Sequence, residues 1–290
     1  MFNHLVCRAA LSALIGLMAV SPLHAADTAR HRDVLKTGDI TLDVIVEGQG
    51  DPIVLLPSRG RDSEDYDRVA EGLVGAGYQV LRPQPRGIGK STGPMQGVTL
   101  HDFANDTAYV IRHYGQGKPA IVVGHAFGNW VARMTAVDHP ELVRGVVIAA
   151  AAAKQYPPSL SEKVGKSADM RLPEAERMGY VQELFFAPGS DASVWKEGWY
   201  AQTSTMQSEA GKATKQSDWW SGGKAPLLDL QAADDPFKPL ASRNEMKDEF
   251  GDRVTIKVVD RASHALIPEQ PAAVVDAIVT WAKTLPPAKS

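Results

Sequence analysis

The sequence predicts an α/β protein with a mostly parallel central sheet and helices on both faces of that sheet. Two observations carry the prediction. Short apolar runs, typical of buried strands, alternate with stretches of helical spacing. Glycine-containing turns separate them in a regular β-α-β-α order, and parallel strands need such crossover connections. A chain of 290 residues with ordinary globular composition is long enough for one large domain of this class.

The first residues of the chain differ in kind from the rest. Arg8 precedes an apolar stretch, 9–20, which is followed by small residues and contains no acidic residue. This layout predicts a secretory signal peptide over residues 1–25, cleaved after Ala25 or Ala26, and hence an exported protein, periplasmic or secreted. The apolar stretch is short for a membrane span, so an uncleaved anchor is the less favoured alternative. After cleavage we expect no stable membrane insertion.

Charge, cysteine and histidine usage exclude several functions. The formal net charge is −3 and no run of like charges occurs, so nucleic acid is not expected as a partner. Cys7 lies in the predicted signal peptide, which leaves the mature chain without disulfides or thiol chemistry. We expect no metal and no cofactor, because four histidines lack partners at metal-ligand spacing: His31, His101, His113 and His139. A small-molecule substrate or ligand is the expected partner, and no oligomeric state is indicated.

The first half of the mature chain holds the most regular alternation. Strands are predicted at 41–47, 52–56, 78–81, 120–124 and 143–149, and helices at 65–76, 100–113 and 127–138. The first of these strands alternates apolar and polar residues, as a half-buried strand does. The second is continuously apolar, which is typical of a strand buried on both faces. Thr99 and Asp102 form a capping box that begins the second helix.

From about residue 150 to 223 the alternation is interrupted. Strands resume at 227–230 and 253–259, with helices from about 242 and at 271–284. Because both flanks are needed to complete one sheet, residues 26–290 are interpreted as a single domain with a cap inserted at about 150–223. A second independent domain is the alternative. The interrupted segment holds four tryptophans, which would suit either an apolar ligand or the core of the cap itself: Trp195, Trp199, Trp219 and Trp220.

Four short motifs each lie at or shortly after the end of a predicted strand. They are Gly124-His125-Ala126-Phe127-Gly128 between a strand and a helix, Pro83-Gln84-Pro85-Arg86-Gly87-Ile88-Gly89-Lys90-Ser91, Asp234-Asp235-Pro236 after a strand, and Ser263-His264-Ala265 after the last strand. Together they resemble the α/β-hydrolase superfamily over nearly all of the mature chain. The first resembles the nucleophile elbow G-x-S-x-G in every feature but its centre, where Ala126 replaces serine. The second departs from the family's loop pattern at Gln84, where an aspartate is usual.

The resemblance implies a role for several residues of this sequence. Asp235, which directly precedes a proline, would be the acid that orients His264 and stabilises its protonated form. Alone, each would be a turn aspartate or a surface histidine, but their joint positions favour a dyad. The backbone amides of Phe127 and Arg59 would form the oxyanion hole. His125, at the predicted elbow, is a possible site-lining residue.

Ser58 is a second departure, because family members often have His-Gly where this chain has Pro57-Ser58. Its hydroxyl would line the site and could be an alternative nucleophile. A polar loop residue is the favoured interpretation, since an activated nucleophile needs a base within hydrogen-bond reach and Ser58 is not on the elbow.

Ala126 has no nucleophilic group, so no acyl-enzyme can form on it. Three explanations of this alanine are open. In the first, the chemistry has changed and His264, oriented by Asp235, activates water or the substrate itself. In the second the protein binds a ligand without catalysis, and in the third a serine was replaced deliberately. The attached signal peptide argues against replacement, and the form Gly-His-Ala-Phe-Gly-Asn looks like a recurring variant among bacterial α/β-hydrolase-like proteins. The favoured hypothesis is a hydrolase of a small ester-like substrate that uses an Asp-His dyad. The alternatives are a catalytically inactive small-molecule binding protein and, least favoured, a structural role.

Overall fold

The computed structural model describes residue 1 and residues 29–288. Apart from Met1, the predicted signal peptide lies outside the described residues. No helix within the part of the chain that is described has the length and apolar character needed to cross a membrane.

One eight-stranded sheet organises the chain, in the order β1-β2-β4-β3-β5-β6-β7-β8. The strands are β1 (His31–Thr37), β2 (Ile40–Glu47), β3 (Pro52–Leu56), β4 (Gln79–Pro83), β5 (Ala120–His125), β6 (Val143–Ala149), β7 (Leu227–Ala232) and β8 (Val254–Val259). β1 pairs with β2, and β2 with β4, in antiparallel fashion, and all other pairs are parallel. The predicted α/β fold with a mostly parallel sheet is confirmed. The edge strand β1 was not predicted.

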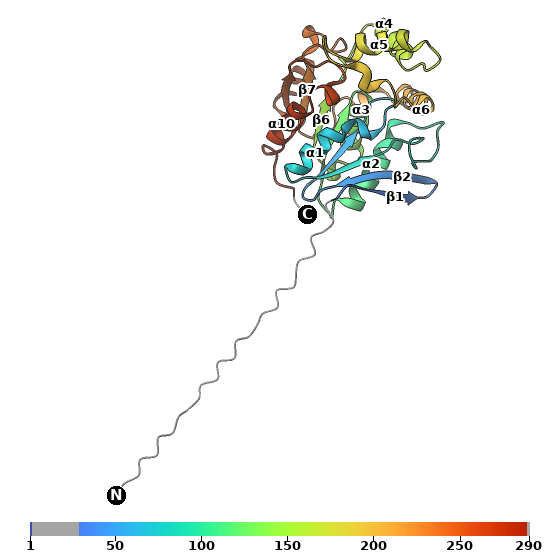
Figure 1. Cartoon of the computed structure of the whole chain (residues 1–290). Helices are drawn as coiled ribbons and strands as arrows, with labels where there is room; N and C mark the ends of the chain where they lie inside the picture. Colours follow the sequence, from blue (N-terminus) through green and yellow to red (C-terminus); the bar gives the residue numbers. More distant parts are fainter. Residues whose placement is uncertain (2–28, 289–290) are drawn as a thin grey trace.

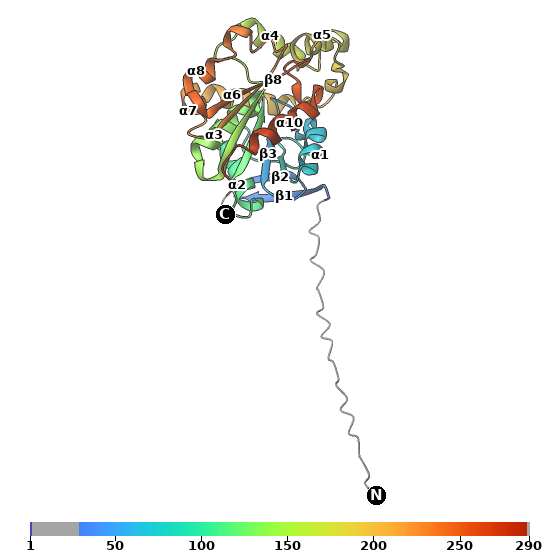
Figure 2. The same cartoon turned by 90° about the vertical axis from the view of Figure 1, so that its left-hand side faces the viewer.

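Helices cover both faces of this sheet (Figures 1 and 2). Within the sheet-flanking layers the longer helices are α1 (Asp67–Gly75), α2 (Leu100–Tyr114), α3 (Phe127–Asp138), α8 (Glu245–Phe250) and α10 (Pro271–Ala282). Short helical turns complete the connections: η1 (Ser63–Tyr66), η2 (Pro140–Leu142), η4 (Leu240–Ser242), η5 (Gly251–Arg253) and α9 (Leu266–Glu269).

The alternation of side chains along the central strands explains their continuous apolar sequences. In β3, Ile53 and Leu55 belong to the core shared with α1 and α10, whereas Val54 and Leu56 belong to the core shared with α2 and α3. Both faces of the strand are therefore buried, and every residue of β3 has to be apolar. The predicted two-sided burial of this strand is confirmed.

Four helices and a short turn lie between β6 and β7, within the segment predicted as a cap. They are α4 (Pro158–Ser167), α5 (Glu174–Phe185), η3 (Ala192–Trp195), α6 (Ala201–Ala213) and α7 (Gln216–Trp219). Figure 1 draws α4, α5 and α6 at the upper end of the sheet, in colours from yellow-green to light orange. Part of the segment has an apolar cluster of its own that includes Phe185, Phe186 and Trp195 and extends to Phe237 and Ala265 outside it.

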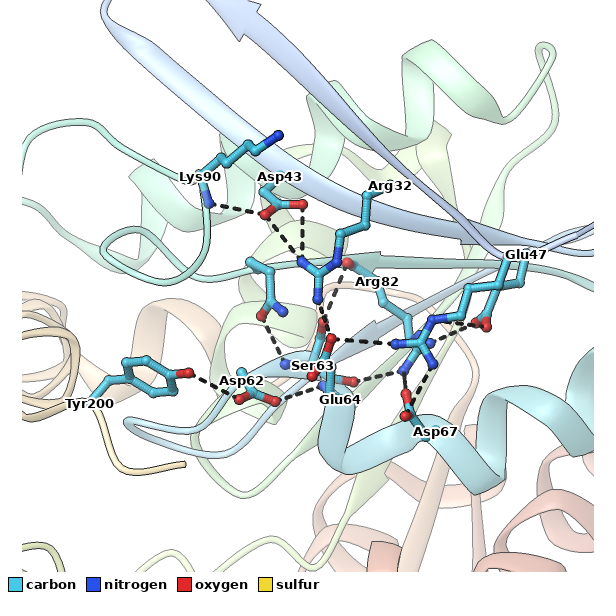
Figure 3. Close-up of polar contacts among 12 residues, drawn as sticks. Arg32, Asp43, Glu47, Asp62, Ser63, Glu64, Asp67, Arg82, Lys90 and Tyr200 are labelled. Carbon is cyan, nitrogen blue, oxygen red and sulfur yellow. Dashed lines mark hydrogen bonds and ion pairs between the residues drawn. The ribbon is translucent and has the colours of Figure 1, made fainter. Parts of the chain in front are cut away.

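β2 is more buried than its alternating sequence predicts. Asp43 was expected on a solvent face, but only 2% of it is exposed. Its carboxylate accepts hydrogen bonds from the Lys90 amide (3.0 Å) and from Arg32 Nη1 (3.1 Å), as Figure 3 shows. The prediction of a half-buried strand was wrong because a loop and an edge strand cover the polar side.

A cluster of ion pairs joins the β1-β2-β4 end of the sheet to the start of α1 (Figure 3). Arg82 of β4 is completely buried and forms ion pairs with Glu47 and Asp67. A buried charge is tolerated only when it is paired, so the two carboxylates are needed for Arg82 to lie inside. Asp67 begins α1, whereas the helix predicted over 65–76 started two residues earlier, within η1.

Candidate active site

Three loops that carry the candidate residues follow the carboxyl ends of parallel strands, the edge at which open α/β sheets bind ligands. Ala126 follows β5, Asp235 follows β7 and His264 follows β8. All three residues are buried or nearly so, with exposed fractions of 9%, 4% and 7% respectively.

Ala126 has a strained backbone at the junction of β5 and α3. Its φ is 48° and its ψ is −113°, a conformation that L-residues rarely adopt. The amide of Ala126 donates to the Ala149 carbonyl (3.0 Å), and its own carbonyl accepts from the Asn129 amide (3.1 Å). The turn is therefore fixed on both sides of Ala126, and its methyl group takes the position a serine side chain would have.

Two glycines make this turn possible, because a larger side chain at either position would clash with the backbone. A Cβ atom on Gly124 would lie 2.2 Å from the carbonyl oxygen of Gly128, and a Cβ on Gly128 would lie 2.4 Å from that of Leu56. Backbone atoms cannot approach a methyl group so closely. The helix start therefore packs directly on β5 and on the end of β3.

Two hydrogen-bonded polar side chains that the sequence analysis did not identify, those of Asn129 and Arg133, support the same turn. The Asn129 side-chain amide donates to the Ala126 carbonyl, and Arg133 Nη2 donates to Asn129 Oδ1. Arg133 is buried against the rings of Trp219 and Trp220, each 4.6 Å from its guanidinium carbon. Burial lowers the pKa of Arg133 to about 9. The spacing of Asn129 and Arg133, four residues apart on a helix, was the available signal.

Asp235 and His264 are in direct contact. His264 Nδ1 lies 3.0 Å from Asp235 Oδ2, and Asp235 Oδ1 accepts a hydrogen bond from the Phe237 amide (2.8 Å). Asp234, the other candidate, contacts this loop only through its backbone, whose carbonyl accepts from Ser263 Oγ (3.1 Å). Because an ionised carboxylate can only accept, Nδ1 carries the proton and Nε2 of the neutral ring is left as the basic nitrogen.

The imidazole of His264 is surrounded mainly by aromatic rings. The ring centroids of Phe237, Phe185 and His125 lie 4.4, 5.7 and 5.9 Å from that of His264. Trp195 packs on Phe185 (5.4 Å) and on His125 (6.0 Å). An apolar environment of this kind strengthens the electrostatic interaction between a carboxylate and an imidazolium, because little water is present to screen it.

His125 is a buried structural partner of the His264 loop. Its Nε2 donates to the backbone carbonyl of His264 at 2.6 Å. Burial, and secondly the neighbouring His264, lower the pKa of His125 to about 3. His125 is therefore neutral under ordinary conditions and holds the loop rather than exchanging protons.

Acid should destabilise the protein through His125. In the unfolded chain its pKa is about 6.5, so below that pH the unfolded state binds a proton that the folded state does not. Stability is then present above pH ~6.5 and is lost toward pH 3 by about 1.4 kcal/mol per pH unit. We expect His125→Gln, which keeps an N–H donor, to flatten the slope by that amount in urea unfolding between pH 5.5 and 4. The exposed control His113→Gln should not, and equal slopes in His125→Gln and native protein would contradict the prediction.

The loop of His264 is also fastened to the inserted segment. Glu269 accepts hydrogen bonds from the Ser263 amide (2.6 Å) and from the Ala187 amide (2.7 Å). The Ala265 amide donates to the carbonyl of Phe185 at the end of α5 (2.7 Å). The residues on both sides of His264 are therefore linked by hydrogen bonds to the inserted segment, one of them through Glu269.

The two amides assigned to an oxyanion hole lie on adjacent segments. Phe127 is the first residue of α3, where backbone N–H groups have no acceptor within the helix and the helix dipole favours negative charge. Arg59 lies in the loop after β3, and Gly128 packs against this loop at Leu56 and Pro57. Ser58 is in the same loop with 8% of its surface exposed. No hydrogen bond joins its hydroxyl to His264 among the described residues.

Two cavities lie next to α3, and only the first of them is lined by a candidate site residue, Phe127. One, of about 60 Å³, is bounded by Pro57, Phe127 and Gly128 and by Gln207 of α6. The other, of about 240 Å³, lies between α3 and the inserted segment, and its lining includes Tyr156, Trp130, Trp219, Trp220 and Lys154. The rings of Trp130 and Trp219 are stacked there with centroids 5.0 Å apart.

The fold and this arrangement define an α/β-hydrolase-type protein, and comparison with known proteins agrees. A model of the alpha/beta hydrolase family matches residues 53–277. The chain belongs to this family. A non-heme haloperoxidase of Rhodococcus erythropolis is 26% identical over 240 residues, which cover 76% of this chain and 87% of that protein.

Solved structures extend the likeness at the level of fold. An esterase from Exiguobacterium antarcticum has a TM-score of 0.70 at 17% identity, covering 84% of this chain and 96% of the esterase. E-2-(acetamidomethylene)succinate hydrolase has a TM-score of 0.71 at 20% identity, covering 88% of this chain and 100% of its own. Identities this low concern the fold alone.

Proposed function

We propose that the protein hydrolyses a small ester-like substrate, with His264 as general base on water and Asp235 as its orienting acid. The observation that carries the proposal is the 3.0 Å contact between His264 Nδ1 and Asp235 Oδ2 at the carboxyl edge of the sheet. The match to the alpha/beta hydrolase family over residues 53–277 supports the reaction class. Ala126 restricts the mechanism to direct attack by water.

The proposed reaction balances without a covalent intermediate. Nε2 of His264 removes a proton from a water molecule as the water oxygen bonds to the carbonyl carbon. The amides of Phe127 and Arg59 donate to the oxygen on which negative charge develops. Asp235 stabilises the imidazolium, which then gives its proton to the leaving alkoxide, and a carboxylic acid and an alcohol are released. The absence of a hydroxyl at position 126 leaves room for the water.

Ser58 is not proposed as the nucleophile. A serine becomes nucleophilic when a base lies within hydrogen-bond reach, and the described residues include no hydrogen bond from its hydroxyl to His264. Its backbone carbonyl accepts from the Arg61 amide (3.2 Å), which is the behaviour of a turn residue.

A small-molecule binding protein without catalysis is the second candidate, and Ala126 itself favours it. The cavity of about 240 Å³ lined by tryptophans would hold an apolar ligand in such a protein. The segment 150–223 would then act as a cap over a binding site. The two candidates differ in whether His264 is needed for turnover.

Turnover of a panel of chromogenic esters decides between them. We expect the native mature protein to hydrolyse at least one ester, and His264→Ala to lower kcat/KM by about 10²-fold, as general-base catalysis contributes. His113→Ala, an exposed histidine on α2, is the matched control and should behave as native. Equal rates in native protein and His264→Ala would reject the hydrolase, and binding without any turnover would favour the second candidate.

A further inference from the structure

Two buried glutamines line the smaller of the two cavities next to α3, the cavity of about 60 Å³. Gln84 directly follows β4 and is 3% exposed, whereas Gln207 lies on α6 of the inserted segment and is 4% exposed. Gln84 occupies the position at which the family's loop pattern usually has an aspartate, which cannot donate a hydrogen bond when it is ionised. The cavity is therefore bounded by one carboxamide from the edge of the sheet and one from the inserted segment.

Each glutamine uses its carboxamide oxygen to hold the loop that follows β3. Gln207 Oε1 accepts a hydrogen bond from the Gly60 amide (2.7 Å), and Gln84 Oε1 accepts one from the Ser63 amide (2.9 Å). A backbone N–H can only donate, so these contacts establish which end of each carboxamide is the oxygen. The NH₂ group of each side chain is therefore left for another partner.

Neither NH₂ group has an acceptor within residues 29–288. The two Nε2 atoms are also not among the unpaired polar atoms that the described protein encloses completely, so each keeps some accessible surface. Because both residues are almost entirely buried and both line the cavity, we assign this surface to the cavity. The N–H donors of Gln84 and Gln207 are then available to a group that enters it.

The other polar side chains of this cavity are already paired. The guanidinium of Arg86 donates to Asp106 through Nε (2.7 Å) and Nη2 (2.8 Å), and to the Pro94 carbonyl through Nη1 (3.2 Å). Thr107 Oγ1 donates to the Phe103 carbonyl (2.9 Å). Among the described residues that line the cavity no cation is therefore free to neutralise an anionic ligand, and an unpaired buried anion is costly. The free donors favour a neutral acceptor, such as a carbonyl oxygen.

The remaining walls and the size of the cavity limit the ligand to a short chain. The walls are formed largely by apolar side chains, among them Leu42, Leu56, Phe103, Val131 and Met206. A volume of about 60 Å³ has room for about four water-sized groups. A chain of a few carbon atoms with one oxygen acceptor would fill it.

The cavity adjoins the segments assigned to the oxyanion hole. Phe127, whose backbone amide is one of the two assigned donors, lines the cavity. Gly60, which Gln207 holds, directly follows Arg59, the source of the other amide. A substrate whose reacting carbonyl lies at these amides can therefore extend a short chain into the cavity.

We propose that Gln84 and Gln207 bind a second, neutral carbonyl oxygen of the substrate, so that the hydrolysed compound is an ester of a short oxo acid. The inference rests on the proposed function for the identification of this ligand as a substrate. Its binding part does not depend on turnover.

Binding of acetoacetamide and of butyramide tests the inference without any reaction. The two amides have the same chain length, and only acetoacetamide has a second carbonyl group. Native protein should bind acetoacetamide about tenfold more tightly, the advantage of one or two hydrogen bonds between neutral groups. Titrations followed by NMR measure both dissociation constants, in His264→Ala as well as in native protein, so that turnover does not contribute.

Glutamate variants separate ligand binding from support of the loop. Gln84→Glu and Gln207→Glu keep an oxygen for the Ser63 and Gly60 amides but replace the NH₂ donor with a second oxygen. Each should still bind butyramide and should lose most of the preference for acetoacetamide. Gln202→Glu, at an exposed glutamine on α6, is the matched control and should keep the tenfold preference. If a buried carboxylate prevents folding, Gln84→Met and Gln207→Met, which also lack the donor, take the place of the glutamate variants.

The side-chain NH₂ signals of the glutamines report the contact directly. Acetoacetamide should shift the signals of Gln84 and Gln207, which are identified by their loss in the methionine variants, and should leave that of Gln202 in place. Equal binding of the two amides by native protein, binding of neither, which would leave the cavity to water, or an unchanged preference in either glutamate variant would overturn the inference. Equal ester turnover in native protein and His264→Ala rejects the proposed hydrolase and leaves a measured preference for acetoacetamide standing.

Discussion

Replacing Gly124 with alanine is expected to destabilise the protein by about 3 kcal/mol or more, the upper range for overpacking a tight core. The added Cβ would lie 2.2 Å from the Gly128 carbonyl oxygen and 2.4 Å from the Asn129 nitrogen. These are backbone atoms, so the clash is relieved only if the start of α3 moves away from β5. For a domain of this size the loss corresponds to a fall in Tm of about 10 °C.

Gly179 provides the matched control for that substitution. It lies on the exposed side of α5, and no atom comes within 4 Å of a Cβ built on it. Gly179→Ala should therefore stabilise the protein by about 0.5–1 kcal/mol, the difference in helix propensity. Calorimetric melting of both variants beside native protein is the measurement. If Gly124→Ala melts at the native temperature, the close packing of β5 on α3 is wrong.

Much of the fold could be predicted because its signals are local. The bounds of β3, β6 and α3 coincide with the predicted ranges, since each is a strongly patterned run that ends at a turn residue. Where no turn residue marks the end of an element, the predicted and observed ends differ: the ends of β7 and α10 each differ by two residues. The predicted helix from about 242 begins as α8 at Glu245, after a separate turn.

Other features depend on contacts between distant segments. The edge strand β1 contains three charged residues in seven and has little strand character, but its pairing with β2 satisfies its backbone. Burial of Asp43 likewise depends on Arg32 and on the 84–91 loop, neither of which is readable from the alternation in β2. Tertiary pairing determines both features.

The candidate site likewise has features that could be predicted from the sequence and features that could not. Ala126, Asp235 and His264 could be placed together because each follows a recognisable strand, and parallel strands end at one edge of a sheet. The contacts that hold these residues in place could not be predicted, because they join segments far apart in sequence. Examples are the hydrogen bond from His125 to the His264 carbonyl and the hydrogen bonds that Glu269 accepts from Ser263 and from Ala187 of the inserted segment.

Placing a serine at position 126 should increase ester turnover by about 10³-fold, a fraction of what a complete triad contributes. The strained turn, with φ of 48° at Ala126, already has the conformation a nucleophile elbow requires. Ala126→Ser adds one hydroxyl to a methyl group and needs no change of backbone. If His264 Nε2 faces that position, it can take the proton of the new hydroxyl, and an acyl-enzyme becomes possible.

A phosphonate that reacts with activated serines separates this outcome from a general gain in stability or expression. Ala126→Ser should be labelled at residue 126, and the double variant Ala126→Ser/His264→Ala should lose both labelling and the increase in turnover. Native protein should remain unlabelled there, because alanine cannot react. Failure of the single variant to gain either property would mean that His264 does not face position 126. Turnover by the native protein would then have to use a water held elsewhere, and the assignment of Phe127 and Arg59 to the oxyanion hole would fall with it.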